Sequence, residues 1–241
     1  MSPRFWVLLQ KEFLEYRRNK LIVGTMAGLP VMFLVITLVP LLTIPPHVPE
    51  EAARALGGQA LLLFLLIPVI LPTTIAAYSV IGEREQGTLE PLLTTPATDR
   101  EILLSKAAAA TAPGIAMTWV MFTIFATILS AFARPAIREG ILTGQTLVAV
   151  GVLAPALGVL AIELSMIVSA RSTDIRVAQQ LSALSVLPAV IVTSLFTYGV
   201  FRASISRYLV IAAIIAAVDL AGWRMVTGLF DRDRLLTRYG G

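Results

Sequence analysis

Residues 55–82 read ALGGQALLLFLLIPVILPTTIAAYSVIG and contain no charged side chain over 28 positions. A helix that crosses the hydrocarbon core of a bilayer needs about 20 apolar residues, so this run is long enough to span a membrane. A sixth and shorter run, 208–218, reaches spanning length only by including Asp219 and Arg224. The other four runs without a charge have 23 to 29 residues and lie at 21–49, 107–133, 140–162 and 177–201.

The composition also indicates a membrane protein. The chain is 57% hydrophobic and 14% charged with a mean hydropathy of +0.83, whereas about a quarter of the residues of a soluble domain are charged. Cysteine is absent, which excludes disulfides, thiolate metal sites and a cysteine nucleophile. We predict an all-α integral membrane protein with one domain, 1–241. Its expected parts are an N-terminal segment, 1–20, and six transmembrane helices at roughly 21–44, 59–82, 102–132, 143–170, 177–200 and 207–227.

The distribution of Lys and Arg predicts the orientation of these spans. With both termini on one side of the membrane, 14 of the 19 basic residues fall on that side. The other five fall in the opposite loops, at Arg54, Arg134, Arg138, Arg202 and Arg207. Cytoplasmic loops of membrane proteins carry the excess of basic residues, so we expect both termini in the cytoplasm.

The N-terminal segment 1–20 has the pattern of an amphipathic helix. On a helical projection one side carries apolar and aromatic residues, namely Phe5, Trp6, Leu9, Phe13 and Tyr16. The other side carries polar residues, namely Arg4, Gln10, Lys11, Glu15 and Arg18. Such a helix lies in the membrane interface. From the residues alone it serves equally well as a simple anchor or as a contact for a partner.

A polar insert, GEREQGTLEPLLTTP at 82–96, separates the second and third spans. Gly87 permits a turn, and Thr88 can cap a short helix that ends at the second proline of the insert. Thr98 and Glu101 then form the pattern of a capping box, which starts the third span. A solvated loop is the alternative, but two helix starts in so short a segment favour a docking element presented to the cytoplasm.

The insert resembles the cytoplasmic loop of permeases of type-2 ABC exporters, the ABC-2 type transporter permease family. A second segment, SARSTDIRVAQQLS at 169–182, resembles the second cytoplasmic turn of that family. The resemblance implies that the short helix between spans two and three is a coupling helix seated on an ATPase. The implied coupling residues are Glu83, Arg84, Glu85, Gly87, Thr88, Leu89, Glu90, Leu92 and Leu93. The implied residues of the second turn are Arg171, Asp174 and Arg176.

The resemblance also implies the partners. It implies a permease dimer (a homodimer or two related chains) in a prokaryotic cytoplasmic (inner) membrane, with two ABC ATPase subunits beneath. An unidentified substrate would move outward by alternating access at the dimer interface. The resemblance is also compatible with an accessory protein as a further partner. The chain lacks a basic block interleaved with aromatic residues, so we expect no nucleic acid.

Nucleotide chemistry is expected on the partner ATPase. A P-loop requires Gly-Lys-Ser/Thr, and none of the three lysines, Lys11, Lys20 and Lys106, follows a glycine. We therefore expect that the chain is not an enzyme and binds no cofactor, with ATP and Mg on the partner. The single histidine, His47, cannot form an HExxH metal site.

Two acidic residues, Glu163 and Asp219, interrupt spans four and six. Charges inside a bilayer are costly and are usually paired or face a cavity. Both residues are candidates for lining the path of a polar or cationic substrate. The alternative is structural, with Glu163 hydrogen-bonded to a neighbouring helix and Asp219 paired with an arginine.

Two other functions remain open from the residues alone. One is a secondary transporter driven by an ion gradient, with Glu163 as proton carrier. The other is a membrane assembly subunit that transports nothing itself. Inverted repeats would favour the secondary transporter, and the sequence shows none.

Overall fold

The computed structural model describes residues 2–45, 49–79, 95–172, 175–200 and 202–229. Within these ranges all regular structure is helical. Six helical segments among the described residues are long and apolar enough to cross a membrane. The predicted all-α architecture with six spans is therefore confirmed.

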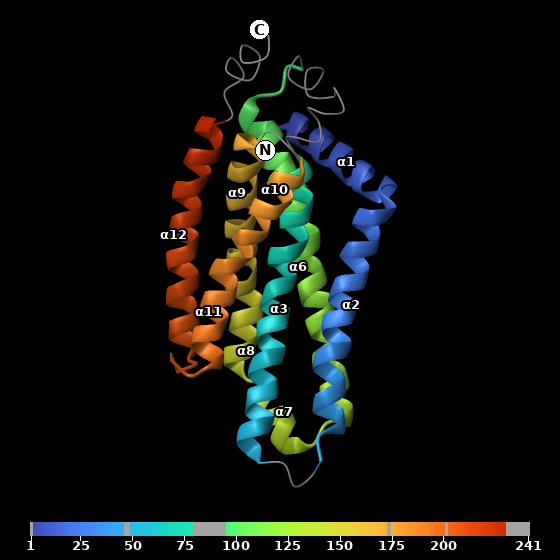
Figure 1. Ribbon diagram of the computed structural model, residues 1–241, viewed down its shortest axis with the longest axis vertical. Coiled ribbons are helices and arrows are strands. Elements are labelled where there is room, and N and C mark those ends of the chain that lie inside the picture. The colour runs from blue at the N-terminus through green and yellow to red at the C-terminus, as the bar shows by residue number, and fades with distance from the viewer. Residues whose placement is uncertain (1, 46–48, 80–94, 173–174, 201, 230–241) are drawn as a thin grey trace.

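The helices run along the long axis of the molecule, with α1 slanted outside one end of the bundle (Figure 1). The fourth span consists of α8, the π-helical η1 and α9, and the fifth of α10, the 3₁₀-helical η2 and α11. The elements in chain order are α1 (Pro3–Arg18), α2 (Lys20–Thr43), α3 (Glu50–Ser79), α6 (Asp99–Phe132), α7 (Pro135–Ile141), α8 (Gly144–Val148), η1 (Ala149–Leu153), α9 (Ala154–Arg171), α10 (Ile175–Ser182), η2 (Ala183–Val186), α11 (Leu187–Thr197) and α12 (Ile205–Leu229).

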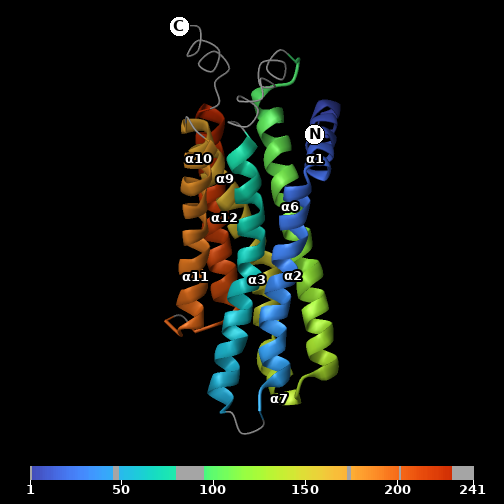
Figure 2. The ribbon, with the colours of Figure 1, turned by 45° about the vertical axis from the view of Figure 1, so that its right-hand side comes forward.

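The second span, α3, forms the centre of the bundle. It packs against α9, α6, α2, α11 and α10, and Figure 2 shows α2 and α6 on one side of it and α10 and α11 on the other. Phe64 of α3 packs against Phe122 and Phe125 of α6, with ring centroids 5.5 and 5.0 Å apart. Gly158 of α9 lies so close to α3 that a Cβ there would be 2.6 Å from the carbonyl oxygen of Pro68. A glycine at 158 is therefore required for the α3–α9 contact.

The outer spans expose apolar side chains. The first span, α2, is apolar on all sides and mostly exposed, with Val31, Val35 and Val39 about half exposed. Ile214 and Val218 of α12 are similarly exposed. A helix that is apolar all round is typical of a membrane span. These surfaces face lipid or another membrane protein.

The fourth span contains a π-turn whose carbonyl groups need an external donor. The N–H of Ala154 bonds to the carbonyl oxygen of Ala149, five residues back. In the same register the carbonyl of Val150 would accept from Pro155, which has no N–H. Instead Trp119 Nε1 of α6 donates to Val150 O at 3.3 Å. A neighbouring helix thus satisfies a backbone group that the bilayer cannot hydrate.

Helix ends differ from the ends of the apolar runs. Helix α3 begins at Glu50 and α6 at Asp99, earlier than the expected starts at 59 and 102, because a helix propagates through charged residues outside the hydrocarbon core. The short helix α7 was not predicted. Its signal is Pro135 directly after Arg134, since proline favours the first position of a helix.

Candidate functional site

The predicted coupling residues lie outside the part of the chain that the structure describes. This holds for Glu83, Arg84, Glu85, Gly87, Thr88, Leu89, Glu90, Leu92, Leu93 and for Asp174 of the second turn. Their contact with an ATPase stays a prediction. Arg171 and Arg176 of the second turn are described and exposed, at the end of α9 and the start of α10. The residues beside the insert that the structure describes lie in α1 and at the start of α6.

The start of α6 is fixed by the predicted capping box. The backbone N–H of Thr98 donates to Glu101 Oε2 at 2.8 Å, and the N–H of Glu101 donates to Thr98 Oγ1 at 3.3 Å. Both donors would otherwise lack partners in the first turn of the helix. The third span therefore begins rigidly, directly after the insert.

The start of α1 is bonded to this same point. Ser2 Oγ accepts the N–H of Phe5 at 3.3 Å and so caps α1, and it donates to Glu101 Oε1. Arg4 Nη1 donates to the carbonyl oxygen of Pro96 at 2.7 Å. The first turn of α1, the end of the insert and the first turn of α6 thus form one hydrogen-bonded junction.

A buried ion pair joins α1 to α6 further along both helices. Lys106 Nζ lies 3.0 Å from Glu12 Oε1, and the side chains are 3% and 6% exposed. Lys11 Nζ lies 3.4 Å from the same oxygen, and Tyr16 Oη donates to Glu12 Oε2 at 3.4 Å. Burial alone would raise the pKa of Glu12, but the charges of Lys106 and Lys11 outweigh it and lower the pKa below its ordinary value of 4.5.

Glu12 was missed in the sequence, although a signal was present. Positions 5, 9, 12 and 16 fall on one face of a helix, so Glu12 is an acid on the apolar side of α1. In the structure Phe5, Glu12 and Tyr16 are buried, whereas Trp6 and Phe13 are exposed. The face of α1 that contacts the bundle is thus narrower than the predicted apolar face.

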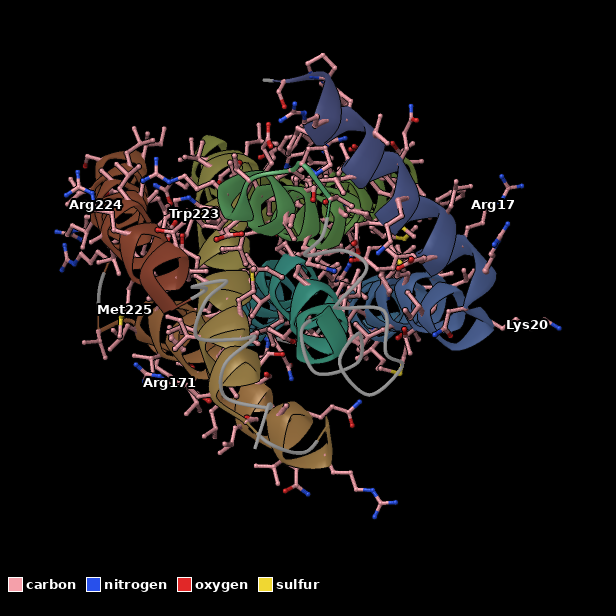
Figure 3. All side chains as sticks on the ribbon, turned by 90° about the horizontal axis from the view of Figure 1, so that it is seen from above. Arg17, Lys20, Arg171, Trp223, Arg224 and Met225 are labelled. Carbon is pink, nitrogen blue, oxygen red and sulfur yellow. The ribbon has the colours of Figure 1, made fainter. Side chains whose placement is uncertain are left out.

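The basic residues divide between the two ends of the bundle. Arg17 and Lys20 point outward at the end that carries α1, and Arg171 and Arg224 lie across the same end (Figure 3). At the opposite end Arg134 donates to the carbonyl oxygens of Ile44 and Pro45 at 2.7 and 3.1 Å. This spatial separation agrees with the count from which the orientation was predicted.

The two intramembrane acids come together at the contact of α9 with α12. Glu163 of α9 is 3% exposed and Asp219 of α12 is 8% exposed. Glu163 Oε2 lies directly against Gly222, one turn beyond Asp219 on α12. Among the described residues neither acid forms an ion pair, and Asp219 Oδ1 has no hydrogen-bond partner. The structural alternative, in which an arginine pairs with Asp219, is not observed among the described residues, and Arg224, five residues further along α12, is exposed.

A cavity of about 170 Å³ lies elsewhere, between α2 and α3. Its lining is mostly apolar, with Thr37 and Gln59 as its polar side chains. Neither intramembrane acid lines it. The structure therefore gives this cavity no role in the site formed by Glu163 and Asp219.

The fold and these junctions define a multi-pass membrane protein with a helix docked across one end of its bundle. A family model described as "ABC-2 family transporter protein" matches residues 6–212. The chain belongs to this family, which confirms the resemblance based on the insert. It is thus the membrane subunit of an ABC transporter, a family whose permeases act with an ABC ATPase and are not themselves ATPases. Comparison with curated proteins finds no significant match.

Proposed function

We propose that the chain is one half of a dimeric, ATP-driven exporter in a prokaryotic cytoplasmic membrane. Two permease copies, identical or related, would form the substrate path between them and move the substrate outward by alternating access. Both termini would lie in the cytoplasm, and ATP and Mg would bind to two separate ATPase subunits. The family match and the separation of basic residues between the two ends support this proposal.

The junction of α1 with α6 carries the coupling part of the proposal. The insert ends at Pro96, whose carbonyl oxygen is held by Arg4, and the capped start of α6 follows within three residues. A force on the insert would therefore reach the third span without a flexible connection. The buried Glu12–Lys106 pair makes α1 move with α6, so both helices would respond together.

The experiment is a coupling test on the permease coexpressed with its ATPase. Gly87→Val and Glu83→Lys should weaken binding of the ATPase or uncouple hydrolysis from transport, because a side chain at 87 opposes the turn and a reversed charge opposes docking. Both variants should insert normally, since neither residue lies in a span. Glu139→Lys is the matched control: Glu139 is an acid with a side chain 74% exposed, in α7 at the opposite end.

Three readouts separate the outcomes. Copurification reports assembly, ATPase rate against transport reports coupling, and labelling of single cysteines at 47 and 90 reports orientation in a chain without native cysteine. Position 47 should react from outside and position 90 only after permeabilisation. Normal ATPase binding and transport by both variants would reduce the insert to a loop. A transport-active monomer without an ATPase would refute the assembly.

A further inference from the structure

The α9–α12 contact buries two acids without a compensating positive charge. Glu163 and Asp219 are 3% and 8% exposed, and among the described residues neither forms an ion pair. Asp219 Oδ1 is buried and lacks any hydrogen-bond partner there. Buried polar atoms nearly always have a partner, so this unpaired carboxyl oxygen requires a physical explanation.

The two acids lie close together at the contact of α9 with α12. Glu163 Oε2 rests against Gly222, which lies three residues from Asp219 and on the same face of α12. The absence of a side chain at 222 is what admits the carboxyl group of Glu163 to this position. The acids therefore form one site and are not two separate buried groups.

Among the described residues no basic side chain forms an ion pair with either acid. Ile162, Met166 and Val226 beside the acids belong to an apolar cluster shared with α6. Lys106 of α6 is held by Glu12, and Tyr208 lies at the far end of α12. Residues 56–79 of α3 include no charged residue, and Tyr78 is their one titratable residue. The remaining charged side chains in the described parts of α6, α9, α10 and α12 lie near the helix ends, at Asp99, Arg100, Glu101, Arg171, Arg176, Arg207 and Arg224.

The chemistry of the site favours a proton as occupant. Two carboxylates cannot both stay ionised side by side in an apolar region, and such pairs share one proton. A divalent cation requires about six oxygen ligands. The two acids supply fewer, and the helical carbonyls around them bond within their own helices. A proton needs only the two carboxyl groups themselves.

We propose that Glu163 and Asp219 form a proton-binding site that holds one proton between α9 and α12. The site lies in the half of the membrane nearer to α1, since Glu163 is about two turns from the end of α9 at Arg171. Loss of the proton leaves two negative charges close together in an apolar region, and their repulsion separates the two helices. Proton binding is thereby linked to the packing of the sixth span against the fourth. The proposal concerns the permease alone and holds whether or not an ATPase partner is coupled as proposed.

Infrared spectroscopy of the full chain in lipid nanodiscs tests the site. The C=O stretch of a protonated carboxyl group is followed from acid to alkaline pH in a buffer whose only cation is choline. The wild type should keep the signal of one protonated carboxyl group at neutral pH. In Glu163→Gln and in Asp219→Asn the midpoint of the remaining acid should move by about one pH unit or more, because coupled acids titrate together.

Two further variants sharpen this result. Gly222→Ala places a methyl group where Glu163 Oε2 lies, and the flexible side chain can turn away, so the variant should fold while the coupling between the acids weakens. Glu139→Gln removes an exposed acid and should leave the protonated signal unchanged. Both main substitutions preserve side-chain shape, and retained helicity and thermal unfolding confirm that each variant is folded.

Three results would overturn the proposal. Absence of a protonated carboxyl group at neutral pH would show that the site holds no proton. An unchanged midpoint in both single variants would show two independent acids. Loss of the signal on adding NaCl or MgCl₂ at constant pH would identify a metal cation as the occupant in place of the proton.

Discussion

Two glutamates of this protein are buried to nearly the same extent, yet their surroundings are opposite. Glu12 is 4% exposed and pairs with a lysine, whereas Glu163 is 3% exposed and lies against Gly222, one turn from a second buried acid, Asp219. The two charges of a buried ion pair compensate each other in only one arrangement of their side chains, so the pair fixes the positions of the two helices that carry them. Two neighbouring buried acids lack a compensating positive charge until a proton or another cation binds. The comparison teaches that the partner, and not the burial, decides whether a buried acid joins helices or responds to its surroundings.

The largest effect is expected from removing the lysine of the paired site. Lys106→Met leaves Glu12 buried with only the half-exposed Lys11 nearby, and breaking such a pair costs about 3–5 kcal/mol. Urea unfolding in mixed micelles should show this loss. Lys11→Met is the control and should cost about 1 kcal/mol or less, as expected of a solvent-exposed pair. Equally small losses of unfolding free energy in both variants would mean that the buried Glu12–Lys106 pair does not hold α1 against α6.

Acid should weaken the same pair to a smaller degree. The pKa of Glu12 lies below its ordinary value of 4.5 in the folded protein. The resulting stabilisation is therefore fully present above pH 4.5 and is lost as the pH falls through the folded pKa. A protonated Glu12 still accepts a hydrogen bond from Lys106, which limits the loss. Unfolding of the wild type and Glu12→Gln should differ at neutral pH and converge in acid; parallel curves would contradict the assignment.

Much of the fold could be predicted because the bilayer imposes a simple constraint. Five charge-free runs of spanning length and a sixth, shorter run predicted six spans, and Thr98 with Glu101 predicted the start of the third. Interruptions within spans could not be predicted in this way. The π-turn of η1 depends on Trp119 reaching Val150 from another helix, and no local pattern shows that contact.

The candidate sites were predictable only in part. Glu163 and Asp219 were noticed because each is a charge within an apolar run. Their meeting depends on the rotation of α9 and α12 about their axes, which no local pattern in the 55 intervening residues shows. Glu12 was overlooked because a single acid in an amphipathic helix is ordinary, and its importance appears only when Lys106 is placed opposite it.

The hydrogen bond from Trp119 to the carbonyl oxygen of Val150 joins two uncharged groups, and its effect on stability should lie between those of the two glutamates. Trp119→Phe removes the donor to Val150 O, and leaving a backbone acceptor without a partner should cost about 1 kcal/mol. Pro155→Ala restores an N–H that this carbonyl can accept within its own helix. The loss caused by Trp119→Phe should therefore be smaller in the Pro155→Ala background, measured by urea unfolding of the four variants as a double-mutant cycle. Strictly additive effects would show that Trp119 does not act through this carbonyl.

The smallest effect at neutral pH, and the one of opposite sign, is expected at the unpaired site. If folding binds one proton between Glu163 and Asp219, stability of the wild type falls by about 1.4 kcal/mol per pH unit through that group, because the native state binds the extra proton. Glu163→Gln needs no such proton, since the amide can donate to Asp219. It should be as stable as the wild type at neutral pH, or more stable by about 1 kcal/mol.

The decisive observation is how this difference changes with pH. Unfolding measured from neutral to alkaline pH should show the advantage of Glu163→Gln growing, because only the wild type must keep its proton against the rising pH. Glu12→Gln, in contrast, should be destabilising at neutral pH because Lys106 then lacks its charged partner. If Glu163→Gln destabilises the protein as Glu12→Gln does, with no dependence on pH, then both acids have the same role. The distinction between the Glu12–Lys106 ion pair and the proton-binding site of Glu163 and Asp219 would then fail.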